Sequence, residues 1–427
     1  MNHFSDAITL RIGVFFDGTG NNLANALPDT PESPAQPRSG SYANAPSNVA
    51  LLHGLYPRGA QLRADVHYLS LYLEGIGTRQ GAADSLLSQA TGRGATGVEA
   101  RVEQAVQWLR EQLRDWRRQY PQQALAGVEV DLFGFSRGAA AARHCANRLA
   151  AGEGGSDPAV TLNFIGLFDT VAAILDPLAR TPAGKQFGTL RLGLADGIAR
   201  HVVQLAAADE FREHFPLVAS GNDCLLPGAH SDIGGGYPAH LREQVLVCKP
   251  FSSRVPASHR PEATAAYAQA ARCLAEHRPP VQAQMDLRTW EVIDEDPRAR
   301  RDAPYKRVFA AVSQTREVPG QLSRVYLSIM RELAVRHDVP LAPLPGEWLA
   351  QIPAQLQPIS QALHAYALGQ SAALQLTGAQ REVLQRYIHT SAHWNPAAAL
   401  RDASLDALFV NRPATDGVRQ VHANPLG

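Results

Sequence analysis

The sequence predicts an α/β protein with a mainly parallel sheet and helices on both faces of that sheet. The first observation is a set of three apolar runs of strand length, at residues 11–16, 66–73 and 128–133. The second is the helical spacing of apolar residues between 98 and 116. Strands that alternate with helices form parallel sheets covered on both sides. The chain has 427 residues, of which 45% are hydrophobic, so it can bury one large core or two ordinary ones.

The N-terminal elements follow from the order of apolar and polar residues. RIGVFF at 11–16 predicts a buried strand, which ends in the glycine- and asparagine-rich turn 17–22. Residues 24–50 are rich in proline, serine, asparagine and alanine, which indicates a loop. VHYLSLYL at 66–73 predicts a second strand. Between 98 and 116 the apolar residues recur every three or four positions, so we expect a helix with one apolar face.

The middle of the chain continues this alternation. The strand predicted at 128–133 leads through a short turn into an alanine-rich run without proline, which predicts a helix. LNFIGLF at 162–168 predicts the next strand, and 201–208 and 224–226 are weaker candidates. The predicted sheet therefore extends over the first half of the chain.

The composition of the sequence changes after about residue 240. Strand signals fade there, while proline and charged residues become more frequent. We therefore expect three parts in the chain. These are a core over residues 1–240, a mostly helical insertion or cap over 241–380, and a C-terminal segment over 381–427 that returns to the core.

Composition excludes several classes of function. The formal net charge is zero, so no basic field indicates nucleic acid as a partner. The four cysteines form no CxxC motif, and we expect neither a metal nor another cofactor. No run of 18 apolar residues is present, and the N-terminus lacks the features of a secretory signal. We expect a protein that is made in the cytoplasm and, if it acts outside the cell, leaves without a cleavable signal.

The stretch GFSRG at residues 134–138 places a serine between a predicted strand and a predicted helix. A serine hydroxyl becomes a nucleophile only with a base, a group that orients the base, and donors to the oxyanion. A nucleophile elbow lifts the serine above the sheet edge by a tight turn, for which Gly134 and Gly138 are small enough. The amide of Arg137 would then point into the site at a helix N-terminus. We therefore predict that Ser136 is a nucleophile.

The acid and the base are expected later in the chain, on loops at the same edge of the sheet. Asp169 follows the predicted strand 162–168 directly and is the expected acid, although this position also suits a helix cap. His230 precedes a glycine-rich turn that would let its ring fold back over Ser136, so it is the expected base. The alternatives that the sequence leaves open are Asp209 for the acid and His389 or His393 for the base.

Several motifs together resemble a known family. They are similar to the α/β-hydrolase domain shared by the type VI secretion lipase effectors of the first phospholipase group and by related bacterial and fungal proteins. The similarity is clear over about residues 11–240. The motifs that carry it are FFDGTGNN at 15–22, GFSRGA at 134–139, GLFDTV at 166–171 and PGAHSDIGGGY at 227–237, with weaker similarity in YIHTSAHWN and PATDGVRQV.

The resemblance implies an α/β-hydrolase-like fold and a specific activity. It implies a triad of Ser136, Asp169 and His230, with an oxyanion site formed by Arg137 and by the loop that holds Gly18 and Thr19. It also implies phospholipase A activity, of type A1 or A2, on phospholipid at a membrane surface. Delivery by a spike or tube component of the type VI system, action in the target cell's periplasm or at its membrane, and a cognate immunity protein would follow.

Two other functions are compatible with the residues. One is a small-ester carboxylesterase without membrane action, because only the resemblance indicates phospholipid. The other is a non-catalytic interaction protein on a hydrolase scaffold, against which the intact set of three residues argues. An uncharged enzyme that acts on lipid needs apolar surface to bind a membrane. The segment 325–335 is the expected source of that surface, unless its helix belongs to the core.

Overall fold

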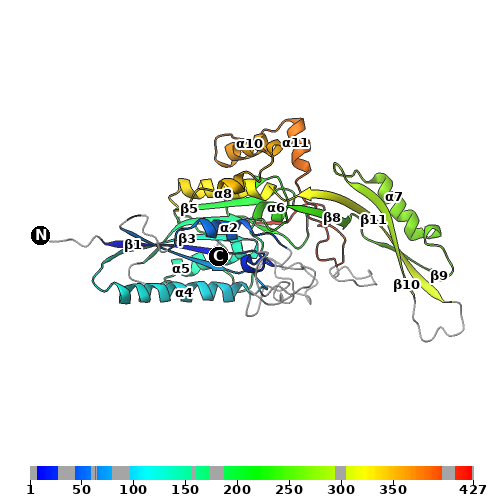
Figure 1. Ribbon diagram of the computed structural model, residues 1–427. Coiled ribbons are helices and arrows are strands. Elements are labelled where there is room, and N and C mark those ends of the chain that lie inside the picture. The colour runs from blue at the N-terminus through cyan, green and yellow to red at the C-terminus, as the bar shows by residue number, and fades with distance from the viewer. Residues whose placement is uncertain are drawn as a thin grey trace.

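The computed structural model describes most of the chain. These residues are 7–26, 44–58, 63, 65–78, 97–155, 159–172, 187–293, 304–396 and 409–425. They form a body built on a six-stranded parallel sheet and an arm built on a smaller antiparallel sheet, which projects from the body (Figure 1). None of the helices in these residues combines the length and the apolar composition that crossing a membrane requires.

The parallel sheet of the body has the strand order β2-β1-β3-β4-β5-β7. All neighbouring strands run in the same direction, so their carboxyl ends lie at one edge of the sheet. The predicted parallel sheet is thus confirmed. The strands are β1 (Ile8–Phe16), β2 (Val66–Leu73), β3 (Leu125–Phe135), β4 (Val160–Phe168), β5 (His201–Ala207) and β7 (Asp223–Leu226).

Helices cover both faces of this sheet, as the sequence predicted (Figure 1). On one face, α4 (Val98–Gln119) and α5 (Arg137–Ala150) pack on alternate residues of β1 and β3 in one hydrophobic cluster. On the other face, α2 (Asn48–Leu55) and α8 (Leu322–Arg336) pack on the residues between them. Because side chains alternate across a strand, both sets must be apolar, and this explains the continuous apolar runs.

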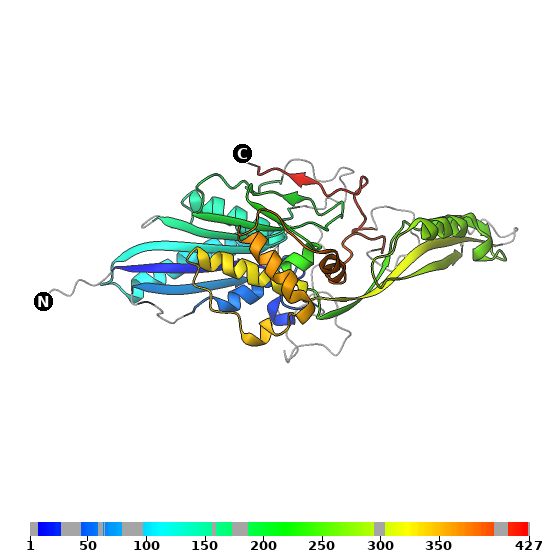
Figure 2. The same ribbon diagram turned by 90° about the horizontal axis from the view of Figure 1, so that it is seen from above.

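Helix α8 belongs to the core of the body. Ile329 and Met330 have an exposed fraction of 0%, and Val325, Tyr326 and Leu327 are buried with them. The expectation that segment 325–335 exposes apolar surface for a membrane is therefore wrong. Most of its apolar residues pack in the same cluster as residues of β3, β4 and α10 (Gln357–Ala367), and Figure 2 shows α8 lying across the sheet.

The arm corrects the prediction of a mostly helical segment over 241–380. Within residues 240–293 and 304–319, β11 of an antiparallel sheet pairs with β10 on one side and with β8 and β9 on the other. Helix α7 (Ala265–Glu276) packs on this sheet. The strands are β8 (His240–Leu246), β9 (Phe251–Pro256), β10 (Gln284–Ile293) and β11 (Tyr305–Pro319).

The sequence did not predict these strands, because their apolar pattern is weak. Along β9 and β10, partly buried residues alternate with exposed polar or charged ones, because one face of the arm is solvated. The prediction of helices holds for α7 and again from residue 322 onward. The remaining elements are α1 (Leu23–Ala26), β6 (Leu217–Val218), α6 (His230–Gly234), η2 (Pro261–Ala263), α9 (Gly346–Leu349), η3 (Ala354–Leu356), α10 (Gln357–Ala367), α11 (Gly378–Gln385) and β12 (Val421–His422).

Candidate active site

The three predicted triad residues follow strands of the parallel sheet. Ser136 comes directly after β3, Asp169 directly after β4, and His230 begins α6, which follows β7. The strands β3 and β4 are neighbours, and the amide of Ser136 donates to the carbonyl oxygen of Phe168 over 3.0 Å. The nucleophile and the acid of the predicted triad thus lie side by side at the carboxyl edge.

The turn at Ser136 has the geometry of a nucleophile elbow. Ser136 adopts φ 59° and ψ −124°, a conformation that costs energy for any residue with a side chain. A Cβ at Gly134 would lie 2.5 Å from the carbonyl oxygen of Gly138. A Cβ at Gly138 would collide with the carbonyl oxygen of Phe16, at the end of β1. Both flanking positions therefore require glycine, as the sequence predicted.

His230 and Asp169 form a buried pair. The Nδ1 atom of His230 lies 2.5 Å from Oδ2 of Asp169, and both side chains are almost fully buried. An ionised carboxylate only accepts, so Nδ1 carries the proton and Nε2 can accept one. The imidazole ring lies between the rings of Phe135 and Phe215, at 4.7 and 5.2 Å between centroids. This packing fixes the ring next to the residue that precedes Ser136.

The environment keeps Asp169 ionised and His230 neutral. Burial acts to raise the pKa of Asp169, but the Arg419 guanidinium and His230 outweigh it and hold that pKa well below its usual range. Burial lowers the pKa of His230, although the Asp169 carboxylate opposes this shift. A neutral imidazole beside an ionised carboxylate is the state that a general base needs at neutral pH.

The side chain of Ser136 is buried, with an exposed fraction of 5%, and its hydroxyl has no hydrogen-bond partner among the described residues. Contacts between a nucleophile and its base are often long without substrate and shorten when it binds. The arrangement therefore suits a nucleophile that engages its base during the reaction.

The loop after β1 lies against the elbow. The predicted oxyanion donors differ in whether their amides already have a hydrogen-bond acceptor. A Cβ at Gly18 would collide with the ring of Phe135, which places this loop beside Ser136. The amide of Gly18 already donates to its neighbour Asp17 over 2.6 Å. Within the described part of the chain, the amides of Arg137 and Thr19 have no acceptor, and the Thr19 hydroxyl is buried without a partner. Arg137 and Thr19 thus remain candidates, while Gly18 is engaged elsewhere.

Asp17 is a buried carboxylate at the same loop, which sequence reasoning did not single out as a titrating group. It accepts from the Tyr72 hydroxyl over 2.5 Å as well as from the Gly18 amide. Burial raises the pKa of Asp17 to about 6, against the lowering effect of these hydrogen bonds. The carboxylate holds the turn that carries Thr19.

The alternative residues have other partners. Oδ2 of Asp209 accepts the amide of Gly228 over 2.7 Å and so holds the turn before α6. Nδ1 of His389 lies 2.7 Å from Oδ1 of Asp232, and its ring stacks on Tyr237. His393 accepts from a neighbouring backbone amide. Neither Asp209 nor these histidines contact the His230–Asp169 pair through any hydrogen bond in the described residues.

Arg419 is a site residue that sequence reasoning missed. Its guanidinium donates to both carboxylate oxygens of Asp169, over 2.7 and 2.8 Å. One weak signal is present in the sequence, since Arg419 lies in the C-terminal tract PATDGVRQV that resembles the family. No spacing rule links an arginine to a carboxylate 250 residues earlier.

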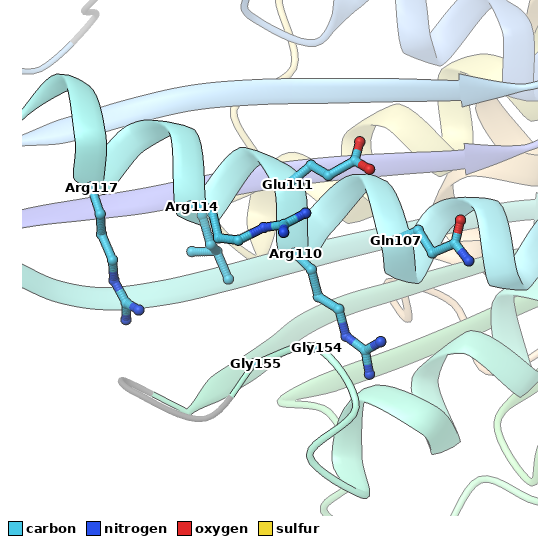
Figure 3. Close-up of a pocket in the computed structure, with 8 residues that line it drawn as sticks. Gln107, Arg110, Glu111, Arg114, Arg117, Gly154 and Gly155 are labelled. Atoms are coloured by element: carbon cyan, nitrogen blue, oxygen red, sulfur yellow. The ribbon is translucent and has the colours of Figure 1, made fainter.

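A separate surface hollow of about 540 Å³ runs along α4 (Figure 3). Three arginines of that helix reach toward it, and no residue of the triad lines it. It is therefore not the cavity of the predicted site. The lining residues are Gln107, Arg110, Glu111, Leu113, Arg114, Arg117, Gly154 and Gly155. Among the residues that the structure describes, no group of three or more His, Cys, Asp or Glu side chains could hold a metal ion.

Comparisons with known proteins relate residues 11–152 to a family and the fold of the whole chain to a solved structure. Residues 11–152 match the family model described as "T6SS, Phospholipase effector Tle1-like, catalytic domain". A solved structure of the Tle1 effector bound to the VgrG spike from the type VI secretion system matches 98% of this chain and 94% of its own chain. The TM-score of that match is 0.74, with 25% sequence identity.

Residues 11–152 are thus similar to a Tle1-like catalytic domain, and the fold of the chain is similar to that of the Tle1 effector. The predicted resemblance and the α/β-hydrolase-like fold are thereby confirmed. The Tle1-like match of the family model covers β1, the elbow and α5, but ends before Asp169 and His230. An uncharacterized protein from Pseudomonas aeruginosa matches 89% of this chain and 53% of its own chain, with 18% identity and a TM-score of 0.47. No curated protein matches the chain.

Proposed function

We propose that this Tle1-like protein is a serine-dependent phospholipase A. The observation that carries the proposal is the buried His230–Asp169 pair, 2.5 Å apart, at the sheet edge where the strained Ser136 sits. A strained elbow, a neutral imidazole and an ionised carboxylate are the three parts that an acyl-transfer site requires. The phospholipid part of the proposal rests on the Tle1-like catalytic domain.

In the first half of the proposed reaction, Oγ of Ser136 attacks the carbonyl carbon of a phospholipid acyl ester. Nε2 of His230 takes the hydroxyl proton, and Asp169 stabilises the imidazolium that forms. The amide of Arg137, at the N-terminus of α5, and a donor from Thr19 receive the oxyanion. The alkoxide of the lysophospholipid leaves with the proton from His230, and the acyl group stays on Ser136.

In the second half, water attacks the acyl ester on Ser136. His230 takes one proton from that water and returns it to Oγ, so the fatty acid leaves and the serine is restored. Ser136, Asp169 and His230 thus serve both halves of the proposed reaction, and His230 acts as base and then as acid in each.

For delivery, we propose that a VgrG-type spike carries this chain, because the Tle1 effector of similar structure was solved bound to VgrG. The protein would then be made in the cytoplasm and act in the periplasm or at the membrane of a target cell. A producing cell would need a cognate immunity protein to protect its own membranes. Co-purification of the chain with a VgrG spike protein from the same organism tests the first of these statements.

The activity is tested with mixed phospholipid vesicles and the variants Ser136→Ala and His230→Ala. We expect each to lower the rate of fatty-acid release by several orders of magnitude, with unchanged thermal unfolding. Release of lysophospholipid positional isomers distinguishes the A1 from the A2 type. Hydrolysis of short soluble esters without any release from vesicles would favour the small-ester carboxylesterase instead. Retention of more than about a tenth of the rate by folded Ser136→Ala would contradict the assignment of the nucleophile.

A further inference from the structure

The C-terminal segment of the chain reaches back to the acid of the proposed triad. Strand β12 (Val421–His422) pairs in parallel with β6 (Leu217–Val218), and Leu217 donates to the carbonyl oxygen of Gln420 over 2.9 Å. This register places Arg419 over Asp169. Nε of Arg419 donates to the carbonyl oxygen of Phe215 over 2.7 Å, which leaves its two terminal nitrogens for the carboxylate.

The contact between Arg419 and Asp169 is bidentate and buried. Nη1 donates to Oδ1 over 2.7 Å, and Nη2 donates to Oδ2 over 2.8 Å. Oδ1 also accepts the amide of Ala207 over 2.9 Å, and Oδ2 faces Nδ1 of His230. Each carboxylate oxygen thus has two partners, and the fork of the guanidinium fixes the plane of the carboxylate.

We propose that Arg419 is a positioning residue of this site, which fixes the orientation of Asp169 and tunes the basicity of His230. The inference rests on the proposed function, because it assigns a role within the triad of Ser136, Asp169 and His230. It means that the last part of the chain completes the catalytic site rather than only covering the body.

Two physical effects support this role. The guanidinium fork holds both oxygens of Asp169, so the carboxylate stays turned toward Nδ1 of His230 and keeps the ring in the tautomer that accepts from serine. The positive charge also offsets the charge of Asp169, which would otherwise stabilise the imidazolium and raise the pKa of the base. Arg419 therefore keeps His230 neutral over a wider pH range.

The charged groups around His230 come from several elements. Asp169 faces its Nδ1, and Arg419 acts through Asp169. Glu210 accepts the backbone amide of His230 over 3.4 Å, and its carboxylate pairs with Arg212. Arg212 lowers and Glu210 raises the pKa of His230. Arg419 differs from Arg212 in that both of its terminal nitrogens contact the carboxylate of Asp169.

The test compares Arg419→Gln, Arg419→Lys and the matched control Arg412→Gln. Arg412 lies in the same segment and pairs with Glu213 over 2.6 Å, away from Asp169. The readouts are kcat/KM against pH on vesicles, the rate of labelling of Ser136 by a fluorophosphonate, and thermal unfolding. For Arg419→Gln we expect the acidic midpoint of the pH profile to move up by about one pH unit, since loss of a nearby cation raises the pKa of His230. We also expect a fall in kcat of about tenfold or more at neutral pH.

For Arg419→Lys, the charge remains but the fork is lost. We therefore expect a midpoint close to that of the wild type, with a lower kcat and a similar KM. Arg412→Gln should keep both the midpoint and the rate. The inference is overturned if folded Arg419→Gln behaves as Arg412→Gln does. Should Arg419→Gln not fold, a wild-type rate of Arg419→Lys at every pH would overturn it equally.

Failure of the proposed function has a different signature. In that case the wild-type protein would not be labelled by the fluorophosphonate, or labelling would persist in Ser136→Ala. If labelling depends on Ser136 and is unaffected by Arg419→Gln, the triad stands and only the role of Arg419 is excluded.

Discussion

Nδ1 of His389 donates to Oδ1 of Asp232 over 2.7 Å, so the second buried histidine near the site has a carboxylate of its own. Asp232 also accepts the amides of His389 and Ala229, over 3.0 and 2.9 Å. It lies two residues after His230, in the same short helix α6. The pair therefore ties the helix that carries the proposed base to the segment around His389.

We expect His389→Ala to keep catalytic activity within about tenfold of the wild type while lowering stability by roughly 1–3 kcal/mol, because it leaves Asp232 buried with one partner fewer. His230→Ala should instead lose activity and keep most of its stability. Urea unfolding and fatty-acid release measured on both variants check this. A folded His389→Ala that is inactive, beside an active His230→Ala, would move the base to the C-terminal part of the chain.

Asp17 gives the protein a pH-dependent contribution to stability. Its pKa is raised to about 6 in the fold, so the protonated form is favoured there. This contribution is fully present below the ordinary carboxyl pKa and is lost as the pH rises through about 6. From pH 4 to pH 8 the loss is on the order of 3 kcal/mol.

Asp17→Asn imitates the protonated form and should therefore remove this loss. The measurement is the free energy of unfolding in urea, for the wild type and the variant, at pH 5 and at pH 8. We expect the variant to gain stability relative to the wild type between these two values. An unchanged difference between the two proteins at both pH values would show that Asp17 does not titrate in this range.

The hydroxyl of Thr19 is buried without a hydrogen-bond partner, in the loop after β1 that lies against the elbow at Ser136. If it binds the oxyanion, Thr19→Val should lower kcat by about 10- to 1000-fold with little change in KM, whereas Thr19→Ser should keep most of the rate. Both variants retain the backbone amide, so the pair separates the two donors. A wild-type kcat for Thr19→Val would assign the second donor to the amide.

The sequence predicted those parts of the site that depend on local geometry. The elbow at Ser136 needs small flanking residues, and Asp169 needs to follow a strand directly, and both leave a local pattern. The contact of Arg419 leaves none, because it depends on how β12 pairs with β6. The arm was missed because its solvated strands carry polar residues at alternate positions, which weakens the apolar signal. For segment 325–335 the sequence leaves a membrane-binding helix and a core helix open, because apolar content alone does not tell a buried helix from an exposed one; the structure shows the core helix.

Because α8 is buried, we expect any membrane-binding surface to lie around the C-terminal segment 409–425. Val418 and Val421 flank Arg419 with exposed fractions of 64% and 56%. Phe211 is 41% exposed and accepts the amide of Ala414 through its carbonyl oxygen, so it lies against the same segment. Apolar side chains next to the residue that binds Asp169 would suit the proposed lipid substrate, since a protein of zero net charge needs apolar contacts to bind a membrane.

Liposome flotation of the Ser136→Ala protein tests this, because no lipid is consumed. We expect Val418→Asp and Val421→Asp to reduce the floating fraction, and we expect high salt to leave wild-type binding intact, since apolar burial is not screened. Leu349→Asp is the matched control, because Leu349 is similarly exposed at 46% but lies on α9. All variants should unfold at a similar temperature. Equal loss of flotation for Leu349→Asp, or none for the two valine variants, would place the lipid contact on another surface.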